Sequence, residues 1–588
     1  MALLGACGTI GTGDAKPVGA TPAQPEGGSA YTEKQGWHTR LYAVAAANPL
    51  ATDAGLQMLR AAGSAVDAAI AVQMVLTLVE PQSSGIGGGA FLLHFDGAKV
   101  DAFDGRETAP AGATESLFLQ ADGKPMPFPA AVVGGRAVGV PGTVRMLELA
   151  HRKHGKLPWA QLFGPAIALA ENGFAVSGRL HTLISADPHL AKDPVAAAYF
   201  FNTDGRAWPA GHVLKNPALA QVLRLIANQG SRALHEGTIA QAVVGKVQNH
   251  PDNPGTLTLA DLAGYRPIQR EALCHPYTAA GSRRLRLCGF PPPSSGAIAI
   301  GQMLGILSNT PAHALPLGPD GIPTPQWLHY YTEAARLAFA DRAQYVADPD
   351  FVQAPGDSWM TMLNPDYLAR RARTIGGTSM KFAQPGQPGA VRTSYAPMPE
   401  QPEYGTSHIS IVDAQGHAVA MTTTIEDAFG SRQMVHGFLL NNELTDFSFT
   451  PRDAAGNLIA NRVQPGKRPR SSMSPTLVFD ADTNELLMST GSPGGAFIIH
   501  YTAKTLWGVF NWGLNAQQSI NLPNFGSANG PTLLEEKRFS PATTDALKAM
   551  GHDVREINMS SGLQALQKTP QGYFGGADPR REGVVLGD

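Results

Sequence analysis

The chain has 588 residues, of which 43% are hydrophobic and 16% charged, so it can bury a large core as one large domain or several ordinary ones. Its formal net charge of −2, without a long basic cluster, argues against nucleic-acid binding. The longest apolar stretch, Ala68 to Val79, is too short to span a bilayer and is predicted to be a buried helix.

The N-terminal segment carries part of an export signal. Leu4-Gly5-Ala6-Cys7 resembles the signal box of bacterial lipoproteins, in which the cysteine is lipidated, but the basic and apolar regions that precede such a box are missing. Either the natural start lies upstream or the match is chance. We expect export to the periplasm or another extracytoplasmic space, with residues 1–30 as signal remnant and flexible tether and Cys7 as candidate lipid anchor.

Hydrophobic periodicity and turn residues predict a mixed α and β chain. The helix over 64–79 begins with a capping box formed by Ser64 and Asp67. The predicted elements are, in chain order, helices over 51–60 and 64–79, a hairpin of strands 91–95 and 99–103, a mostly helical region over 130–270, a helix after the Pro291 to Gly296 run, and a helix over 327–345.

The glycine loop Gly85-Ile86-Gly87-Gly88-Gly89-Ala90 formally fits a dinucleotide-binding fingerprint. Such a site needs a strand before the loop and a helix after it, whereas here a helix precedes and a strand follows. His151 and His154 lie near each other, but no zinc-binding motif includes them. We therefore expect neither a cofactor nor a metal.

Two cysteines remain if Cys7 is lipidated. Cys274 and Cys288 flank residues 277–282, which read as the turn of a hairpin that could bring the two thiols together. In an exported protein such a pair can oxidise to a disulfide. The alternative is two unrelated buried thiols.

The composition and the hydrophobic pattern of the chain change at Thr406. Residues 384–405 are rich in Pro and Gly, have no apolar period and are predicted to be mobile, and a strand pattern begins directly after them. The strand and the run 417–424 flank a turn, which predicts a hairpin. A three-residue loop with Gly416 in the left-handed region would pair Thr406 with Thr424, and a two-residue loop would pair it with Thr423.

A threonine at such a boundary can act as a nucleophile. Its hydroxyl reacts poorly unless a base takes the proton, and a residue released at a new N-terminus carries that base as its own α-amine. Before cleavage, the Thr406 hydroxyl could attack the carbonyl of Gly405, since glycine tolerates the strained backbone that this attack requires. The alternative is that threonines are simply common in strands.

Several segments resemble, in the same order, those of the γ-glutamyltransferase family, over about residues 40–588. They are Asp104 to Pro110, Pro291 to Gly296, Thr406-Ser407-His408, Thr422 to Glu426 with Phe429-Gly430, Asn441 to Phe447, Lys467 to Pro475, Gly491 to Gly495 and Ala577 to Arg581. The resemblance implies an N-terminal nucleophile hydrolase that cuts itself between Gly405 and Thr406. The large subunit would cover residues 31–405 and the small subunit 406–588.

The resemblance also implies a role for each site residue. Thr406 is the nucleophile and Thr424 orients it. The backbone amides of Gly494 and Gly495 stabilise the oxyanion. The groups that hold the two charged ends of the substrate are Arg106, Ser471 and Ser472 for the α-carboxylate, and Glu426, Glu443 and Asp446 for the α-ammonium.

The sequence departs from the family at three places. Many relatives carry Asn at the position of Glu426, and some carry Gln at that of Glu443. The segment 449–466, which in several members is a lid with an aromatic gate, holds Phe449 as its only aromatic residue. The segment 449–466 thus predicts a shorter or differently closed lid and leaves the acceptor preference open, and the assignment of Asp446 is better supported than that of Glu426.

The fold implied by the resemblance is an α+β four-layer αββα sandwich. The implied activity is glutathione hydrolysis and γ-glutamyl transfer, with glutathione and other γ-glutamyl compounds as donors, amino acids or dipeptides as acceptors, and the two subunits as each other's partners. Two alternatives remain: a glutaryl or cephalosporin acylase of the same fold, and an inactive extracytoplasmic binding protein.

Overall fold

The computed structural model describes residues 27–29 and 31–588. Cys7, its surrounding signal box and most of the predicted tether lie outside the described residues. Within the described part, no helix combines the length and the apolar character needed to cross a bilayer.

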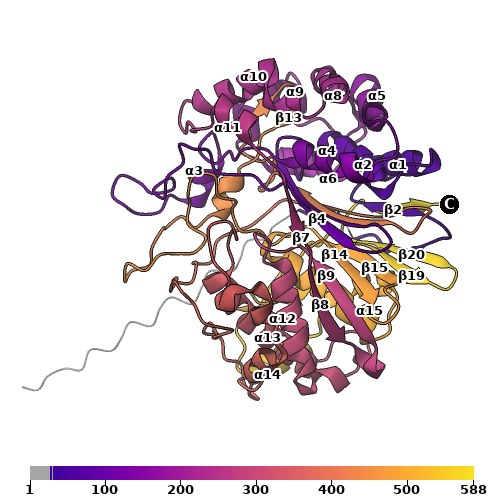
Figure 1. The fold of residues 1–588 in the computed structure, drawn as a ribbon, viewed down its shortest axis with the longest axis vertical. Helices are drawn as coiled ribbons and strands as arrows, with labels where there is room; N and C mark the ends of the chain where they lie inside the picture. Colours follow the sequence, from indigo (N-terminus) through magenta and orange to yellow (C-terminus); the bar gives the residue numbers. More distant parts are fainter. Residues whose placement is uncertain (1–26, 30) are drawn as a thin grey trace, which may run out of the picture.

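Two seven-stranded sheets lie face to face at the centre of the molecule, and each is antiparallel throughout (Figure 1). The first sheet has the order β1 (Trp37–Thr39), β20 (Gly572–Ala577), β19 (Gln564–Thr569), β15 (Leu486–Gly491), β14 (Thr476–Asp480), β9 (Arg284–Gly289) and β8 (Leu273–Thr278). The second has the order β21 (Val584–Gly587), β2 (Ala43–Ala46), β10 (Ser407–Val412), β11 (Ala418–Thr424), β3 (Gly89–Phe95), β4 (Val100–Asp104) and β7 (Ile268–Glu271).

Helices cover the outer face of each sheet, which gives the predicted αββα order of layers (Figure 1). The helices on the side of the second sheet include α1 (Pro49–Arg60), α2 (Ala65–Val79), α4 (Thr143–His154), α5 (Gly164–Asn172), α6 (Gly178–Ala186), α8 (Pro217–Gln229), α9 (Arg232–His235), α10 (Gly237–Gln248) and α11 (Leu259–Gly264). Those on the side of the first include α12 (Gly296–Ser308), α13 (Pro325–Tyr345), α14 (Pro365–Ala372) and α15 (Ile498–Phe510).

Shorter elements complete the fold. They are α3 (Phe128–Val132), α7 (Pro194–Phe200), α16 (Ala516–Asn521), α17 (Pro541–Ala549), β5 (Phe174–Ala175), β6 (Val213–Leu214), β12 (Met434–Val435), β13 (Phe438–Leu439), β16 (Phe525–Gly526), β17 (Thr532–Glu535) and β18 (Val554–Ile557).

The core is divided among the three interfaces between layers. Helix α2 is buried along its whole length, because its apolar side chains meet the second sheet on one side and other helices on the other. Its predicted capping box is present: Ser64 accepts from the Asp67 amide, and Asp67 accepts from the Ser64 amide. Between the two sheets, the rings of Phe91 and Phe290 stack with their centroids 4.1 Å apart.

The hairpin that begins at Thr406 forms with the three-residue loop. Strands β10 and β11 pair so that Ser407 faces Thr423 and Val412 faces Ala418, which places Thr406 beside Thr424. Gly416 has a φ of +80°, in the left-handed region that this loop requires. Of the two registers left open by the sequence, the one that pairs Thr406 with Thr424 is therefore correct.

The segment 384–405 forms neither helix nor strand, in line with its composition, but it is held along much of its length. The Met398 amide donates to the Ala343 carbonyl of α13, and the Ala396 amide donates to the Leu458 carbonyl. The Gln401 side chain donates to the carbonyls of Thr445 and Phe447 at 2.9 Å each. In the uncut chain this segment is therefore a strap across the surface of the site rather than a free linker.

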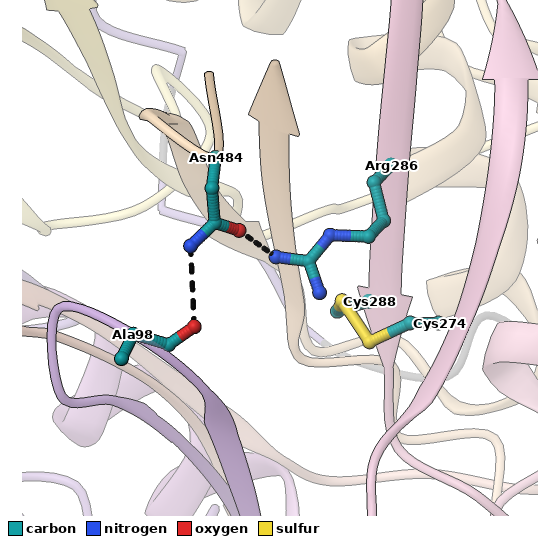
Figure 2. The surroundings of a disulfide bond; sticks show 5 residues. All are labelled: Ala98, Cys274, Arg286, Cys288 and Asn484. Atoms are coloured by element: carbon teal, nitrogen blue, oxygen red, sulfur yellow. Dashed lines mark hydrogen bonds between the residues drawn. A yellow bond between two sulfur atoms is a disulfide. The ribbon is translucent and has the colours of Figure 1, made fainter. Parts of the chain in front are cut away.

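Cys274 and Cys288 form a disulfide across the β8–β9 hairpin, where they face each other in register (Figure 2). The turn starts later than the sequence suggests, because β8 continues to Thr278. Figure 2 also shows Arg286 of β9 bonded to Asn484, whose side chain donates in turn to the Ala98 carbonyl at 3.1 Å. These contacts join the hairpin to its own sheet and to the β3–β4 turn of the other sheet.

Candidate active site

Thr406 stands at the start of β10, with its hydroxyl directed at the peptide bond that precedes it. Its Oγ1 lies 2.6 Å from the Gly405 carbonyl oxygen, and the Thr424 hydroxyl donates to the same oxygen. The Thr424 hydroxyl accepts from the Glu426 amide at 2.8 Å, which fixes its orientation. The predicted nucleophile, the peptide bond that it is predicted to cut and the predicted orienting hydroxyl are thus within hydrogen-bond reach of one another.

Gly405 has a backbone conformation that side chains oppose. Its φ is +26°, and a Cβ added there would lie 2.3 Å from the Glu426 carbonyl oxygen. Glu426 itself has a φ of +76°, an uncommon conformation for a residue with a side chain. The backbone is therefore strained at Gly405 and at the neighbouring Glu426, where the chain is predicted to cut itself.

A small pocket adjoins Thr406 and is lined by nine of the eleven predicted catalytic, substrate-binding and cleavage-site residues. Its lining consists of Arg106, Glu403, Tyr404, Thr406, Thr424, Glu426, Glu443, Asp446, Ser471, Ser472, Met473, Gly495 and Ile498. Gly494 precedes Gly495, and Gly405 lies between Tyr404 and Thr406. Only about 10 Å³ remains free for water, since residues 403–405 occupy the pocket.

Three acids meet in this pocket and all are buried. Glu426 accepts from the side chain of Asn442 and, at 3.2 Å, from the hydroxyl of Thr445. Burial raises the pKa values of Glu426, Glu443 and Asp446 well above their usual range. Neighbouring carboxylates raise them further, whereas Arg106 opposes the rise for Glu443 and Asp446.

Arg106 lies against two of these acids. Its guanidinium pairs with Glu443 and with Asp446, and it also donates to the carbonyls of Pro469, at 3.2 Å, and Arg470, at 3.1 Å. The structure thus joins Arg106 to the predicted ammonium-binding acids, whereas the sequence assigned it to the opposite end of the substrate.

The two serines have different surroundings. Ser471 accepts from the Met473 amide at 3.1 Å, and its carbonyl accepts from Ser295. The predicted Pro291 to Gly296 run therefore supports this segment. The Ser472 hydroxyl faces the pocket and bonds to Arg342 and Glu403.

Sequence reasoning missed Arg342 and Glu403. Arg342 belongs to α13, for which the sequence predicted a helix without a functional role, and Glu403 belongs to the segment expected to be mobile. The Arg342 guanidinium lies 2.7 Å from Glu403, and Arg470 lies 4.0 Å from it. Burial alone would raise the pKa of Glu403, but the two guanidiniums and Ser472 hold it below its usual value. No sequence signal joined residues so far apart in the chain.

The glycines of the predicted oxyanion loop leave no room for side chains. Gly494 and Gly495 have φ values of +131° and +55°. A Cβ on Gly495 would lie 1.9 Å from the Glu403 carbonyl oxygen, so the strap passes directly over this loop. Glycine is the residue that permits both this backbone and this approach.

The segment 449–466 has no aromatic gate over the pocket. Phe449 is buried and stacks on Phe118, with centroids 4.5 Å apart, and Phe128 lies beside it. Ile459 forms a bridge with Ala396 of the strap. In the uncut chain this segment thus packs against the strap.

One cluster of metal-binding residue types lies elsewhere, between α13 and the residues that follow α17. His329, Glu333 and His552 bring ligand atoms within 4.8 Å of one another. The two histidines bond to each other at 2.8 Å, and Glu333 pairs with Arg336 at 2.6 Å. The second nitrogen of each ring bonds to Gly376 or Thr532. Because these atoms already have protein partners and a guanidinium lies beside them, we assign no metal here.

Comparisons with known proteins match the chain to one protein family over most of its length. Residues 51–588 match the family model described as gamma-glutamyltranspeptidase. Glutathione hydrolase proenzyme of Bacillus subtilis (strain 168) is 35% identical over 558 residues, covering 92% of this chain and 91% of the relative. The proenzyme of the same name from Escherichia coli (strain K12) is 34% identical over 549 residues, covering 91% and 90%.

Solved structures agree on the fold. Cephalosporin acylase from Bacillus halodurans superposes with a TM-score of 0.81 at 25% identity, covering 99% of both chains. Gamma-glutamyltranspeptidase from Helicobacter pylori gives a TM-score of 0.51 at 33% identity, covering 56% of this chain and 90% of that one.

Proposed function

The chain belongs to the γ-glutamyltranspeptidase family, and we propose that it is a self-processing glutathione hydrolase and γ-glutamyltransferase with Thr406 as its nucleophile. Cleavage at Gly405–Thr406 would free the Thr406 amine. Glutathione and related γ-glutamyl compounds would be donors, and water, amino acids or dipeptides would be acceptors.

The observation that carries this proposal is the excess of acids over cations in the pocket. Glu443 Oε2 and Asp446 Oδ1 are buried, and no hydrogen bond reaches either atom from the residues that the structure describes. Among the described residues, Arg106 is the cation that pairs with these acids, and it reaches Glu443 and Asp446 but not Glu426. A buried anion is costly unless a cation pairs with it, and the α-ammonium of a γ-glutamyl group is such a cation.

The proposed reaction follows from the positions around Thr406. The Thr406 hydroxyl attacks the γ-carbonyl of the donor while its α-amine, with an ordinary pKa of about 8, takes the proton. The amides of Gly494 and Gly495 receive the developing negative charge. The amine of the leaving group takes the proton, and the γ-glutamyl ester passes to water or to an acceptor amine. Thr424 keeps the nucleophile in place by the contact described above.

A cephalosporin or glutaryl acylase is the second candidate, because the cephalosporin acylase structure superposes on nearly the whole chain. A glutaryl group has no amine, so it would leave the three acids with no cation other than Arg106. An inactive binding protein would not need Thr406 and Thr424 at the strained peptide bond.

Product analysis tests the function. Incubated with glutathione, the purified enzyme is expected to release glutamate and cysteinylglycine, and added glycylglycine should yield γ-glutamyl-glycylglycine. Mass spectrometry of the products with and without this acceptor measures the balance of hydrolysis and transfer. Intact glutathione after prolonged incubation, from a preparation that is fully cut into two chains, would contradict the proposal.

We infer that the protein is exported and that Cys7 is its anchor, which is supported by the signal box around Cys7 and by the disulfide between Cys274 and Cys288. In protein isolated from the native envelope, both hairpin cysteines should resist thiol labelling until a reductant is added. Labelling of both without reductant would contradict the bridge and count against export. Mass spectrometry of the N-terminal peptide would identify a lipidated Cys7.

A further inference from the structure

A second cavity lies in the helix layer that covers the second sheet, and it shares no lining residue with the pocket at Thr406. Its volume is about 310 Å³, at the lower end of the range for cavities that hold small organic ligands. The walls come from α4, from α9 with its flanking residues, and from residues 263–267 at the end of α11 (Figure 1). We call it the α4–α9 cavity.

The α4–α9 cavity is positively charged, whereas the chain as a whole has a net charge of −2. Four arginines and two glutamates line it, which leaves two positive charges in excess. These residues are Arg145, Arg152, Arg232, Arg266, Glu148 and Glu236. An excess of guanidinium groups around an open space favours an anionic ligand.

The two glutamates do not balance the arginines. Glu148 accepts from the Ser231 hydroxyl at 2.7 Å and from the Ser231 amide at 3.3 Å, and it pairs with Arg152 at 3.2 Å. Glu236 lies 3.9 Å from Arg145 and 3.8 Å from Arg232, too far for a hydrogen bond to either. Glu148 is therefore engaged in the wall, and Glu236 holds neither of its arginines closely.

Arg145 and Arg266 come together at one side of the cavity. Both guanidiniums donate to the carbonyls of Ala263 and Tyr265, and among the described residues Arg266 has no carboxylate partner. Burial lowers the pKa of Arg145 and the charge of Arg266 lowers it further, while Glu236 and Glu148 oppose the shift. Two like charges therefore lie side by side, held by neutral carbonyls, where an anion would relieve their repulsion.

The charge and the shape of the cavity favour a phosphate over a carboxylate. A phosphate dianion matches the excess of two positive charges, and its oxygens point in several directions, so guanidiniums from different walls can contact it together. A carboxylate has one charge and two oxygens in one plane. The cavity is also larger than one phosphate, which leaves space for an organic group beside it.

We propose that the α4–α9 cavity binds a phosphate dianion, free or as the head group of a small ester, with Arg145 and Arg266 as its main contacts. Binding there does not depend on the proposed function, because the cavity and the pocket at Thr406 have separate linings.

Titration calorimetry at about pH 8 and constant ionic strength tests the ligand class, since the second phosphate pKa is about 6. Glycerol 3-phosphate and inorganic phosphate should each bind at one site per chain, and glycerol should not bind. Malonate, a dicarboxylate, should bind at least about tenfold more weakly. Tighter binding of glycerol 3-phosphate identifies an ester as the ligand, and tighter binding of inorganic phosphate identifies the free ion. Equal binding of malonate, or no binding of either phosphate, would overturn the proposal.

Two substitutions test the place of binding. Arg145→Gln and Arg266→Gln should each raise the Kd of glycerol 3-phosphate and inorganic phosphate by roughly 10- to 100-fold, the range for a lost hydrogen bond to a charged group. Arg373→Gln removes an exposed arginine at the end of α14, outside the cavity, and should leave both Kd values within about twofold. If Arg145→Gln fails to fold, Arg266→Gln decides the question, because the Arg266 side chain is exposed.

Thr406→Ala separates this cavity from the pocket at Thr406. In the uncut chain residues 403–405 fill that pocket and leave only about 10 Å³ free, so an anion cannot enter it. Thr406→Ala should therefore bind both phosphates as tightly as the wild type does. Binding that disappears in Thr406→Ala, or that is unchanged in Arg266→Gln, would place the anion elsewhere and overturn the proposal.

Discussion

Thr406→Ala is expected to remain a single chain of 61.9 kDa and to have no measurable hydrolase activity. The variant lacks the hydroxyl that lies 2.6 Å from the Gly405 carbonyl oxygen, so no group is left there to open the peptide bond. It also lacks the nucleophile for the substrate. Denaturing gel electrophoresis and N-terminal sequencing measure the cut, and release of p-nitroaniline from γ-glutamyl-p-nitroanilide measures the activity.

Thr406→Ser is the matched control, since it keeps a hydroxyl at the same place. It should be cut, although more slowly, and retain some activity. If Thr406→Ala were still cut and sequencing found alanine at the new N-terminus, self-processing through Thr406 would be refuted.

The second large effect concerns the choice of acyl group. Wild-type enzyme should prefer γ-glutamyl-p-nitroanilide to glutaryl-p-nitroanilide by roughly 30-fold to several thousand-fold in kcat/KM. Leaving one partner of a buried charge pair without its counterpart costs about 2–5 kcal/mol, and each 1.4 kcal/mol is a factor of ten. Glutaryl lacks only the ammonium, so it leaves Glu426, Glu443 and Asp446 as they are in the empty pocket.

Asp446→Asn provides the control for this preference. Because its carboxylate has an oxygen without a hydrogen bond in the pocket, the substitution should lower the rate on the γ-glutamyl substrate far more than on the glutaryl one. Equal rates for the two substrates on the wild type, or faster glutaryl cleavage, would favour the acylase and leave the fold and the role of Thr406 intact.

Local patterns were enough to predict the elements near the site. The capping box of α2 and the positive φ of Gly416 are set by residues within a few positions of one another, and both are present. The αββα arrangement came from the family resemblance, because periodicity indicates strands but not which of them share a sheet. Strand β10, for example, has β2 as a neighbour, more than 300 residues earlier in the chain.

Contacts between distant segments could not be predicted in this way. The sequence did not indicate that Arg106 would turn to Glu443 and Asp446, because nothing in either segment specifies which charges will meet. Nor did it indicate that Glu403 would lie between Arg342 and Ser472, since a Pro- and Gly-rich segment has no periodicity that reports its tertiary contacts. The contacts of the strap with the pocket could therefore be seen only in the structure.

The position of the proposed cut within the sheets also governs how the protein can fold. In the second sheet, β10 and β11 from after the cut lie between β2 and β3 from before it, and in the first sheet β14 lies beside β9. The uncut chain assembles both sheets in a unimolecular reaction. Once Gly405 and Thr406 are parted, regaining the same structure from denaturant requires two separate polypeptides to meet, so its rate depends on protein concentration. We therefore expect the lifetime of the mature enzyme to depend on slow unfolding, because refolding of the two separated chains would be slow at low protein concentration.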